Sequence, residues 1–152
     1  MIPGKISKRV VSDRLAWVDR MFKEIRALPL DSKTGFMQDS RNIWAAESCL
    51  RRALEATFDL GRHIIAKGFG EAVTEYKEIA STLNRHNVIS ASDLELMRKL
   101  AGYRTRLVHF YHDVSEDELF EICTFHLGDV ERIVNTLRSW LANNSGLMDE
   151  TL

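Results

Sequence analysis

The sequence has few of the residues that interrupt helices. Only two prolines occur, Pro3 and Pro29, so proline geometry allows long helices anywhere after residue 30. No Asn-Gly or Asp-Gly pair separates alternating apolar and polar residues, which argues against β-hairpins. No apolar run is long enough for a membrane span, and no apolar segment of a signal peptide follows the charges near the N-terminus. We therefore expect an all-α protein of the cytoplasm.

An excess of positive charge is also missing. The 152 residues include 21 Lys and Arg against 22 Asp and Glu, for a net charge of -1. Because dedicated nucleic-acid-binding domains usually carry a clear basic excess, any contact with nucleic acid must come from a local basic patch. The length suits one domain, and a chain of this size can bury a core without disulfides or metals.

Cysteines are scarce too, and the common catalytic motifs are absent. Cys49 and Cys123 are the only two cysteines, and each lies within an apolar helical pattern. We interpret both as buried free thiols, and a disulfide or redox pair is the alternative. The chain has no glycine-rich phosphate loop, no nucleophile elbow and no Cys/His array for a metal. Chemistry that depends on those motifs is therefore not expected.

Apolar residues recur at helical spacing through most of the chain. This periodicity predicts five helices, the third of them short, over residues 7–27, 39–67, 74–84, 92–112 and 115–143. The prediction is an all-α, up-and-down helical bundle of four long helices plus a short helix, in a single domain over residues 1–143. Residues 144–152 show no periodic pattern, and we expect them to form a disordered tail.

Local signals mark the ends of these helices. Ser92 followed by Glu95, and Ser115 followed by Glu118, are capping boxes in which each side chain satisfies a free backbone N–H. Residues 31–35 are rich in turn-forming residues, and we predict a loop there. The two capping boxes therefore predict the starts of the fourth and fifth helices.

Reactive side chains are concentrated in one stretch, residues 104–113, of the fourth predicted helix. On a helix that turns about 100° per residue, Arg104 and Tyr111 lie nearly in line beside the apolar stripe. His109 lies on the far side, on a polar and mostly basic face that also holds Arg98, Thr105 and His112. Arg104 and His109 are about 140° apart, so they cannot stack on each other. They can still converge on a ligand in a cleft that another surface completes.

Other interpretations of these residues remain open. A single Arg or His on a helix is most often a solvated surface residue. His109, His112 and Asp113 are a conceivable metal site, but His-x-x-His on a helix is a weak signal and no partner ligand stands out. The acidic cluster over residues 116–121 suits the N-terminus of a helix, where carboxylates are stabilised by the helix dipole, better than it suits acid–base catalysis.

The spacing of Arg104, His109 and Tyr111 resembles the Arg-x4-His-x-Tyr signature of HepT-like toxins with a HEPN domain. The run from Leu107 to Val114 is similar to the sequence that usually surrounds this signature, and residues 50–61 also have the character of the family. The resemblance covers roughly residues 6–142. It implies a HEPN-type helical bundle that forms a homodimer, in which two copies of the motif meet in one cleft.

The resemblance also implies a function. Proteins of this kind are metal-independent endoribonuclease toxins of type VII-like toxin–antitoxin systems, and they need no cofactor. A cognate nucleotidyltransferase antitoxin similar to MntA holds them in check, in some pairs by attaching AMP to the motif tyrosine. By this resemblance Arg104 and His109 are the catalytic residues and Tyr111 is the candidate for adenylylation. The candidate contacts to an RNA substrate are Arg98, Thr105, Arg106 and His112.

The implied chemistry is physically sensible without a metal. RNA carries its own nucleophile, the 2′-hydroxyl beside the scissile phosphate. An imidazole can move the protons, and the planar fork of a guanidinium matches a phosphate whose charge is growing. One position departs from the family, since Thr105 stands where asparagine is usual. The alternatives are a non-catalytic nucleotide- or substrate-binding partner of a nucleotidyltransferase, and a structural dimer whose motif is vestigial.

Overall fold

The computed structural model describes residues 5–109 and 111–149, and helices dominate it. The elements, in chain order, are β1 (Ile6–Ser7), α1 (Lys8–Arg26), α2 (Lys33–Met37), α3 (Ser40–Phe69), α4 (Tyr76–Arg85), α5 (Ala91–His109), η1 (Tyr111–Asp113), α6 (Glu116–Glu121), η2 (Ile122–His126), α7 (Leu127–Asn143), η3 (Ser145–Leu147) and β2 (Met148–Asp149). The prediction of an all-α helical bundle is confirmed. None of the helices in the described part of the chain is both long and apolar enough to span a bilayer.

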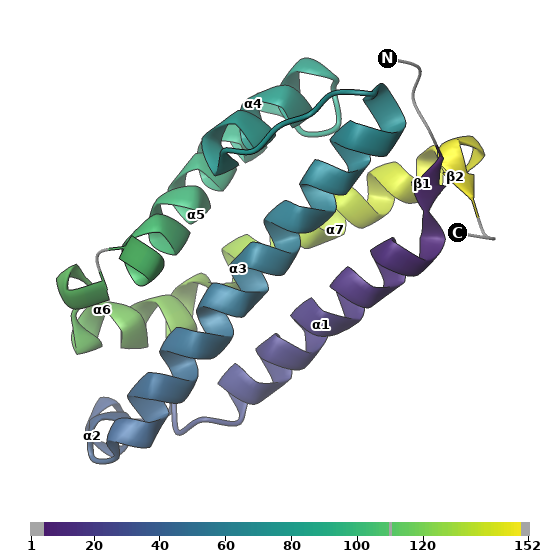
Figure 1. Ribbon diagram of the computed structural model, residues 1–152. Coiled ribbons are helices and arrows are strands. Elements are labelled where there is room, and N and C mark those ends of the chain that lie inside the picture. Colours follow the sequence, from purple (N-terminus) through teal and green to yellow (C-terminus); the bar gives the residue numbers. More distant parts are fainter. Residues whose placement is uncertain (1–4, 110, 150–152) are drawn as a thin grey trace.

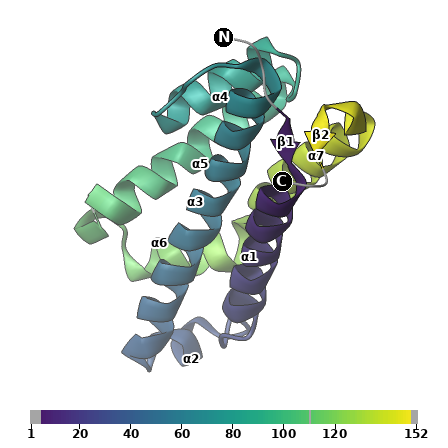
Figure 2. The same ribbon diagram turned by 45° about the vertical axis from the view of Figure 1, so that its right-hand side comes forward.

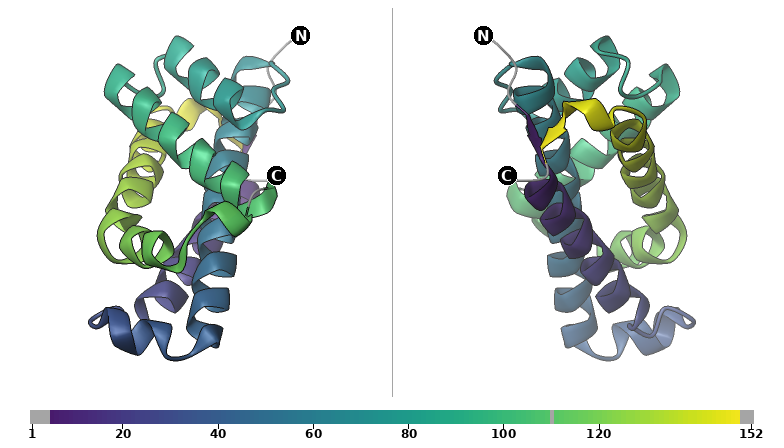
Figure 3. Two further views of the ribbon diagram at one scale, coloured as in Figure 1. Left: turned by 90° about the vertical axis from the view of Figure 1, so that its left-hand side faces the viewer. Right: turned by 90° about the vertical axis from the view of Figure 1, so that its right-hand side faces the viewer.

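The long helix α3 is the centre of the bundle. It packs against α1 along most of its length on one side and against α4 and α5 on the other, as Figures 1 and 2 show. Figure 3 shows α6 and α7 returning from the end of α5, so that α7 closes the bundle on the side opposite to α3. The central place of α3 follows from its sequence. Its apolar residues extend around more than one face of the helix, so the helix can bury surface against neighbours on two sides.

A glycine in α3 allows the close approach of α4. A Cβ atom built at Gly61 would lie 3.1 Å from side-chain atoms of Ile79 and Leu83, which both belong to the buried face of α4. That distance is tighter than ordinary van der Waals contact, so a larger residue would require Ile79 and Leu83 to shift by a few tenths of an ångström. The glycine that weakens the helix in isolation thus has a packing role. At the C-terminal end, Gly70 takes the left-handed conformation that ends α3 (φ 67°).

The helix α5 is held at both of its ends. At the start, the buried carboxylate of Asp93 lies 2.9 Å from Nε of Arg132, and the hydroxyl of Thr136 donates to it (3.3 Å), which ties α5 to α7. At the end, Arg106 forms a double contact with Glu118 of α6. These contacts fix the helix that carries the sequence motif.

The predicted helices differ from the structure at three places along the chain. Residues 33–37 form the short helix α2, where a loop was predicted. The helix predicted over 92–112 ends at residue 109, and residues 111–113 form a 3-10 turn. The helix predicted over 115–143 begins as predicted, with Ser115 Oγ accepting from Glu118 N (3.0 Å), but a π-helical turn divides it into α6 and α7. The apolar periodicity continues across the two breaks, after residue 109 and at residues 122–126, so the periodicity could not reveal either break.

The two ends of the chain meet in a small parallel pair of strands. Ile6 pairs with Met148 and Ser7 with Asp149, and the Lys5 ammonium donates to the carbonyl oxygen of Gly146 (2.7 Å). The expectation that residues 144–152 have no structure is therefore wrong for residues 145–149. The two short strands were not predicted, although the fold as a whole is the expected helical bundle. A pairing of two residues from opposite ends of the chain leaves no alternating pattern to detect.

Both cysteines are free, as predicted, although only one is fully buried. Cys123 lies in the core, and burial raises the pKa of its thiol to about 12. Cys49 is half-buried, and burial raises the pKa of this thiol as well. Both groups are therefore protonated and unreactive at neutral pH.

Candidate active site

An open pocket of about 680 Å³ lies between α3, α4 and α5, and the two reactive residues of the motif both line it. Its lining residues are Glu55, Asp59, Arg62, Thr74, Glu75, Tyr76, Lys77, Ala101, Arg104, Thr105 and His109. The side chains of Arg104 and His109 leave α5 in different directions. Residues of α3 and of the start of α4 form the walls of the pocket that face them. The cleft that the sequence required is thus present within one chain.

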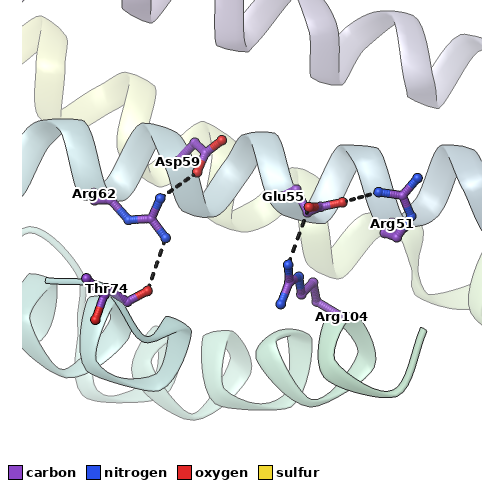
Figure 4. A network of polar contacts seen from close by, with 6 residues as sticks. All are labelled: Arg51, Glu55, Asp59, Arg62, Thr74 and Arg104. Atoms are coloured by element: carbon purple, nitrogen blue, oxygen red, sulfur yellow. Dashed lines mark hydrogen bonds and ion pairs between the residues drawn. The ribbon is translucent and has the colours of Figure 1, made fainter. Parts of the chain in front are cut away.

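Arg104 extends from α5 toward α3, where a carboxylate and an aromatic ring hold its guanidinium. Its Nη2 atom lies 3.5 Å from Oε2 of Glu55, and its central carbon lies 4.5 Å from the centre of the Tyr76 ring. Arg51 pairs with the other oxygen of Glu55 at 2.5 Å (Figure 4). The contact with Glu55 is long for a hydrogen bond, and Nε of Arg104 is buried with no bonding partner. Arg104 is therefore placed, and the long contact with Glu55 engages only one of its two terminal nitrogens.

A second arginine ties the wall of the pocket to α3. Arg62 pairs with Asp59 one turn earlier in the helix (3.0 Å), and its NH2 group donates to the carbonyl oxygen of Thr74 (3.1 Å), as Figure 4 shows. Its central carbon also lies 5.8 Å from the centre of the Tyr76 ring. The segment before α4 is therefore anchored beside the motif.

Tyr76, the first residue of α4, contacts both Arg104 and Arg62 through its ring. Its ring stacks on the buried ring of Phe58, with centres 4.6 Å apart and planes at 17°. Burial raises the pKa of the Tyr76 phenol, so the hydroxyl stays protonated at neutral pH. Glu55 and Tyr76 have no counterpart in the sequence motif, and nothing in their spacing indicated that they would meet Arg104.

Three of the predicted substrate contacts do not line the pocket. Arg98 pairs with Glu95 on the surface of α5 (2.7 Å). Arg106 is engaged with Glu118 and donates to the carbonyl oxygen of Asp113 (3.1 Å). His112 is exposed on η1. Of the four predicted contacts, the structure brings only Thr105 into the pocket with Arg104 and His109.

The remaining predictions concern Tyr111 and a metal. The backbone of Tyr111 belongs to η1, two residues beyond His109, but its side chain lies outside what the structure describes. His112 lies 3.5 Å from Asp113. Within the described ranges, no group of three or more His, Cys, Asp or Glu side chains is arranged to hold a metal ion.

Comparisons with known proteins converge on one family. The family model "Ribonuclease HepT-like" matches residues 19–137, which include α3, α4 and α5. A "tRNA nuclease HepT" from Aphanizomenon flos-aquae is 21% identical over 133 residues, or 87% of this chain and 90% of that protein. An "mRNA nuclease HepT" from Shewanella oneidensis is 22% identical over 130 residues, or 86% of this chain and 97% of that protein.

A solved structure shares the fold. It is the tri-AMPylated HEPN toxin of Shewanella oneidensis in complex with MNT antitoxin, and it superposes with a TM-score of 0.76. The sequence identity is 22%, and the match covers 86% of this chain and 97% of that chain. The likeness in fold therefore extends over most of the chain.

Proposed function

Because this chain belongs to the family of HepT-like ribonucleases, as the motif indicated, we propose that it is an endoribonuclease that cleaves RNA in the pocket between α3, α4 and α5. The observation that carries the proposal is that Arg104 and His109, far apart around α5, line one pocket. The proposed reaction uses neither a metal nor a cofactor. Its support is the chemistry of the side chains in the pocket, which comprises an imidazole and a guanidinium.

The proposed reaction is an attack of the RNA on itself. The 2′-oxygen attacks the neighbouring phosphorus, the bond to the 5′-oxygen breaks, and the products are a 2′,3′-cyclic phosphate and a 5′-hydroxyl. One proton leaves the 2′-hydroxyl and one must reach the 5′-oxygen, and the imidazole of His109 can serve both transfers. Arg104 stabilises the negative charge that grows on the phosphoryl oxygens, using the donors that Glu55 and Tyr76 leave free.

We propose further that the active form is a homodimer with a composite site. The pocket is open to solvent on one side, which leaves room for a second copy to cover the RNA. A second His109 would supply a separate acid and base for the two proton transfers. In this arrangement the face of α5 around His109 meets the partner chain.

Regulation by a nucleotidyltransferase antitoxin similar to MntA is part of the proposal. Tyr111, two residues after His109, is the proposed acceptor of AMP. The support is the Shewanella oneidensis toxin, which is described as tri-AMPylated and in complex with MNT antitoxin. A nucleotide attached there would place new bulk and negative charge beside the residue that moves protons, in the cytoplasm where such a pair would act.

The test is cleavage of labelled RNA by the purified protein with a chelator present. Wild-type protein is expected to cleave, while His109→Ala and Arg104→Ala lose at least about a hundredfold in rate. His126→Ala is the matched control, because this half-exposed histidine pairs with Asp129 outside the pocket. Equal cleavage by wild type and His109→Ala would contradict the proposal. Loss of wild-type cleavage in chelator would contradict its metal independence.

Two features of the pocket favour a second candidate function. Glu55 partly neutralises Arg104, and Thr105 lines the pocket where the family usually has asparagine. A protein with this pocket could bind a nucleotide without cleaving RNA, as the partner of a nucleotidyltransferase. Calorimetry that shows nucleotide binding, together with no RNA cleavage and no growth arrest on expression, would favour this candidate over the nuclease.

A further inference from the structure

The position of Arg104 depends on a column of three stacked groups that come from three helices. Phe58 of α3 is fully buried at its base. The Tyr76 ring of α4 lies on it, with centres 4.6 Å apart and planes at 17°, and the Arg104 guanidinium of α5 lies 4.5 Å from the centre of the Tyr76 ring. Because core packing fixes Phe58, the plane of the Tyr76 ring is fixed as well.

The ring of Tyr76 contributes to Arg104 in a way that a carboxylate cannot. A guanidinium within about 6 Å of a ring centre is attracted to the face of the ring, and it can stack flat while its N–H edges stay free. The 3.5 Å contact with Glu55 engages only one of those edges. The column therefore orients the arginine without consuming the donors that a phosphate needs.

The position of the ring is also secured by a second arginine, Arg62 of α3. Arg62 donates to the carbonyl oxygen of Thr74, two residues before Tyr76, and so ties the start of α4 to α3. The same guanidinium lies 5.8 Å from the centre of the Tyr76 ring. Gly61 lets α4 pack closely against α3 just beyond this point. Tyr76 thus has little freedom to move away from Arg104.

We propose that Tyr76 is a positioning residue for the ribonuclease reaction, whose ring holds the guanidinium of Arg104 in the orientation that meets the scissile phosphate. The inference rests on the proposed ribonuclease function and assigns a specific role to the ring. The hydroxyl is not required for this role, because the stacking uses the face of the ring.

The first test compares two replacements of Tyr76 in the RNA cleavage assay. Tyr76→Leu removes the ring, and kcat is expected to fall about 10- to 100-fold with little change in KM. Tyr76→Phe keeps the ring and is expected to restore most of that loss. In the Arg104→Ala background, Tyr76→Leu should cause no further loss, since its effect acts through the arginine. Additive losses, or an equal loss in Tyr76→Phe, would overturn the proposal.

Two controls separate positioning from general damage to the fold. Trp17→Leu removes a ring that also lies under a cation, Arg20 at 5.8 Å, but on α1, and it is expected to cleave like wild type. The melting temperature of Tyr76→Leu should stay within a few degrees of wild type. Should the leucine variant not fold, Tyr76→Met replaces it, because a flexible thioether fills the same space without a ring.

A second measurement needs no catalysis, so it distinguishes failure of this inference from failure of the proposed function. The Nε–H signal of Arg104 is assigned in an NMR spectrum by its absence in Arg104→Ala. Ring-current shielding should displace this signal in wild type and Tyr76→Phe, and the displacement should vanish in Tyr76→Leu. An unchanged signal would overturn the positioning, whatever the activity. A wild-type protein with the displaced signal but no RNA cleavage would instead refute the proposed function.

Discussion

Among single residues, Glu55 has the most direct influence on how the proposed site meets RNA. Its carboxylate lies 3.5 Å from Arg104 and 2.5 Å from Arg51, so it balances positive charge where a phosphate has to bind. An incoming phosphate must compete with this carboxylate for Arg104, and it is also repelled by it. The net charge of -1 leaves no general attraction to offset that repulsion.

Replacing Glu55 with glutamine is therefore expected to tighten RNA binding by roughly five- to tenfold. Removing one negative charge a few ångströms from the phosphate is worth about 1 kcal/mol in a solvated pocket. The measurement is fluorescence anisotropy with an RNA that carries a 2′-methoxy group at the cleaved position. Glu95→Gln is the control, because Glu95 pairs with Arg98 outside the pocket. Unchanged or weaker binding by Glu55→Gln would refute this account of the charge balance.

A second residue prediction concerns pH and stability. Nε2 of His63 accepts a hydrogen bond from the backbone N–H of Ser7 (3.0 Å), and burial, with smaller effects of Lys67 and Arg14, lowers the pKa of His63. The folded protein therefore favours the neutral imidazole of His63. The stabilisation that this imidazole gives to the fold is complete above the pKa that His63 has in the unfolded chain. The effect is lost as pH falls through the lower pKa of the folded protein.

The free energy of unfolding should accordingly fall between pH 7.5 and pH 5 by more in wild type than in His63→Gln. Glutamine keeps an acceptor for the Ser7 N–H but does not titrate. Urea unfolding at the two pH values measures both proteins. Equal pH dependence in the two would show that His63 does not carry the effect.

The residues of the site differ in how far the sequence could reveal them. Arg104 and His109 were predicted, because both belong to one motif on one helix. Glu55 lies 49 residues before Arg104 in the chain and on another helix, so only the packing of α3 against α5 brings the two together. Tyr76 lies in the short helix predicted over residues 74–84, but stacking on Phe58 leaves no pattern in the sequence that would have singled it out.

Among the elements, the connection from α5 to α6 depends on one side chain. Arg106 bonds to both oxygens of Glu118 (2.5 and 3.1 Å) and to the carbonyl oxygen of Asp113. It therefore closes the turn that contains η1 and with it the backbone of Tyr111. The sequence predicted Arg106 as a contact to RNA. In the structure its side chain is engaged within the chain and holds the segment 111–113 next to the site in place.

Arg106→Ala is expected to increase amide hydrogen exchange in residues 111–121 severalfold. Because both partners are about one-third exposed, the loss in the free energy of unfolding should stay below about 1 kcal/mol. Mass spectrometry of exchanged peptides measures the first quantity and urea unfolding the second. Arg98→Ala removes another arginine–glutamate pair of α5 and should leave this segment unchanged. Faster exchange in α3 as well would indicate general destabilisation instead.

The boundaries that the sequence did not predict share a physical cause. In the π-helical turn η2, Ile122 and Cys123 are buried while Phe125 is 72% exposed. The buried face of the helix therefore changes direction here, although the helical spacing of apolar residues continues in the sequence. Periodicity detects a helix but not an extra residue in one turn. The pairing of β1 with β2 depends on contact between the two ends of the chain, which no local pattern records.

At the scale of the whole molecule, the outward face of α3 connects the pocket with an exposed aromatic residue. Trp44 is 64% exposed, and its spacing from Glu55, Asp59 and Arg62 places all four on one stripe of the helix. Trp44 lies about 16 Å along the helix from Glu55, at a rise of about 1.5 Å per residue. A large exposed aromatic side chain on the same stripe of α3 as the pocket fits a surface that a second copy covers. It supports the proposed homodimer, in which the pocket of each chain faces the other.

Mixing wild-type protein with an inactive variant tests this arrangement directly. Arg104 and His109 of one chain line the same pocket, and the proposed composite site adds the partner's His109 for the second proton transfer. A dimer of one wild-type chain and one His109→Ala chain therefore lacks an imidazole in each of its two sites and is expected to lose most of its activity. After subunit exchange at equal concentrations, half of the wild-type chains are in such mixed dimers, so RNA cleavage should fall to about half of that by the same amount of wild-type protein alone. Unchanged cleavage, with exchange confirmed by native mass spectrometry, would show that each chain works without the partner's His109.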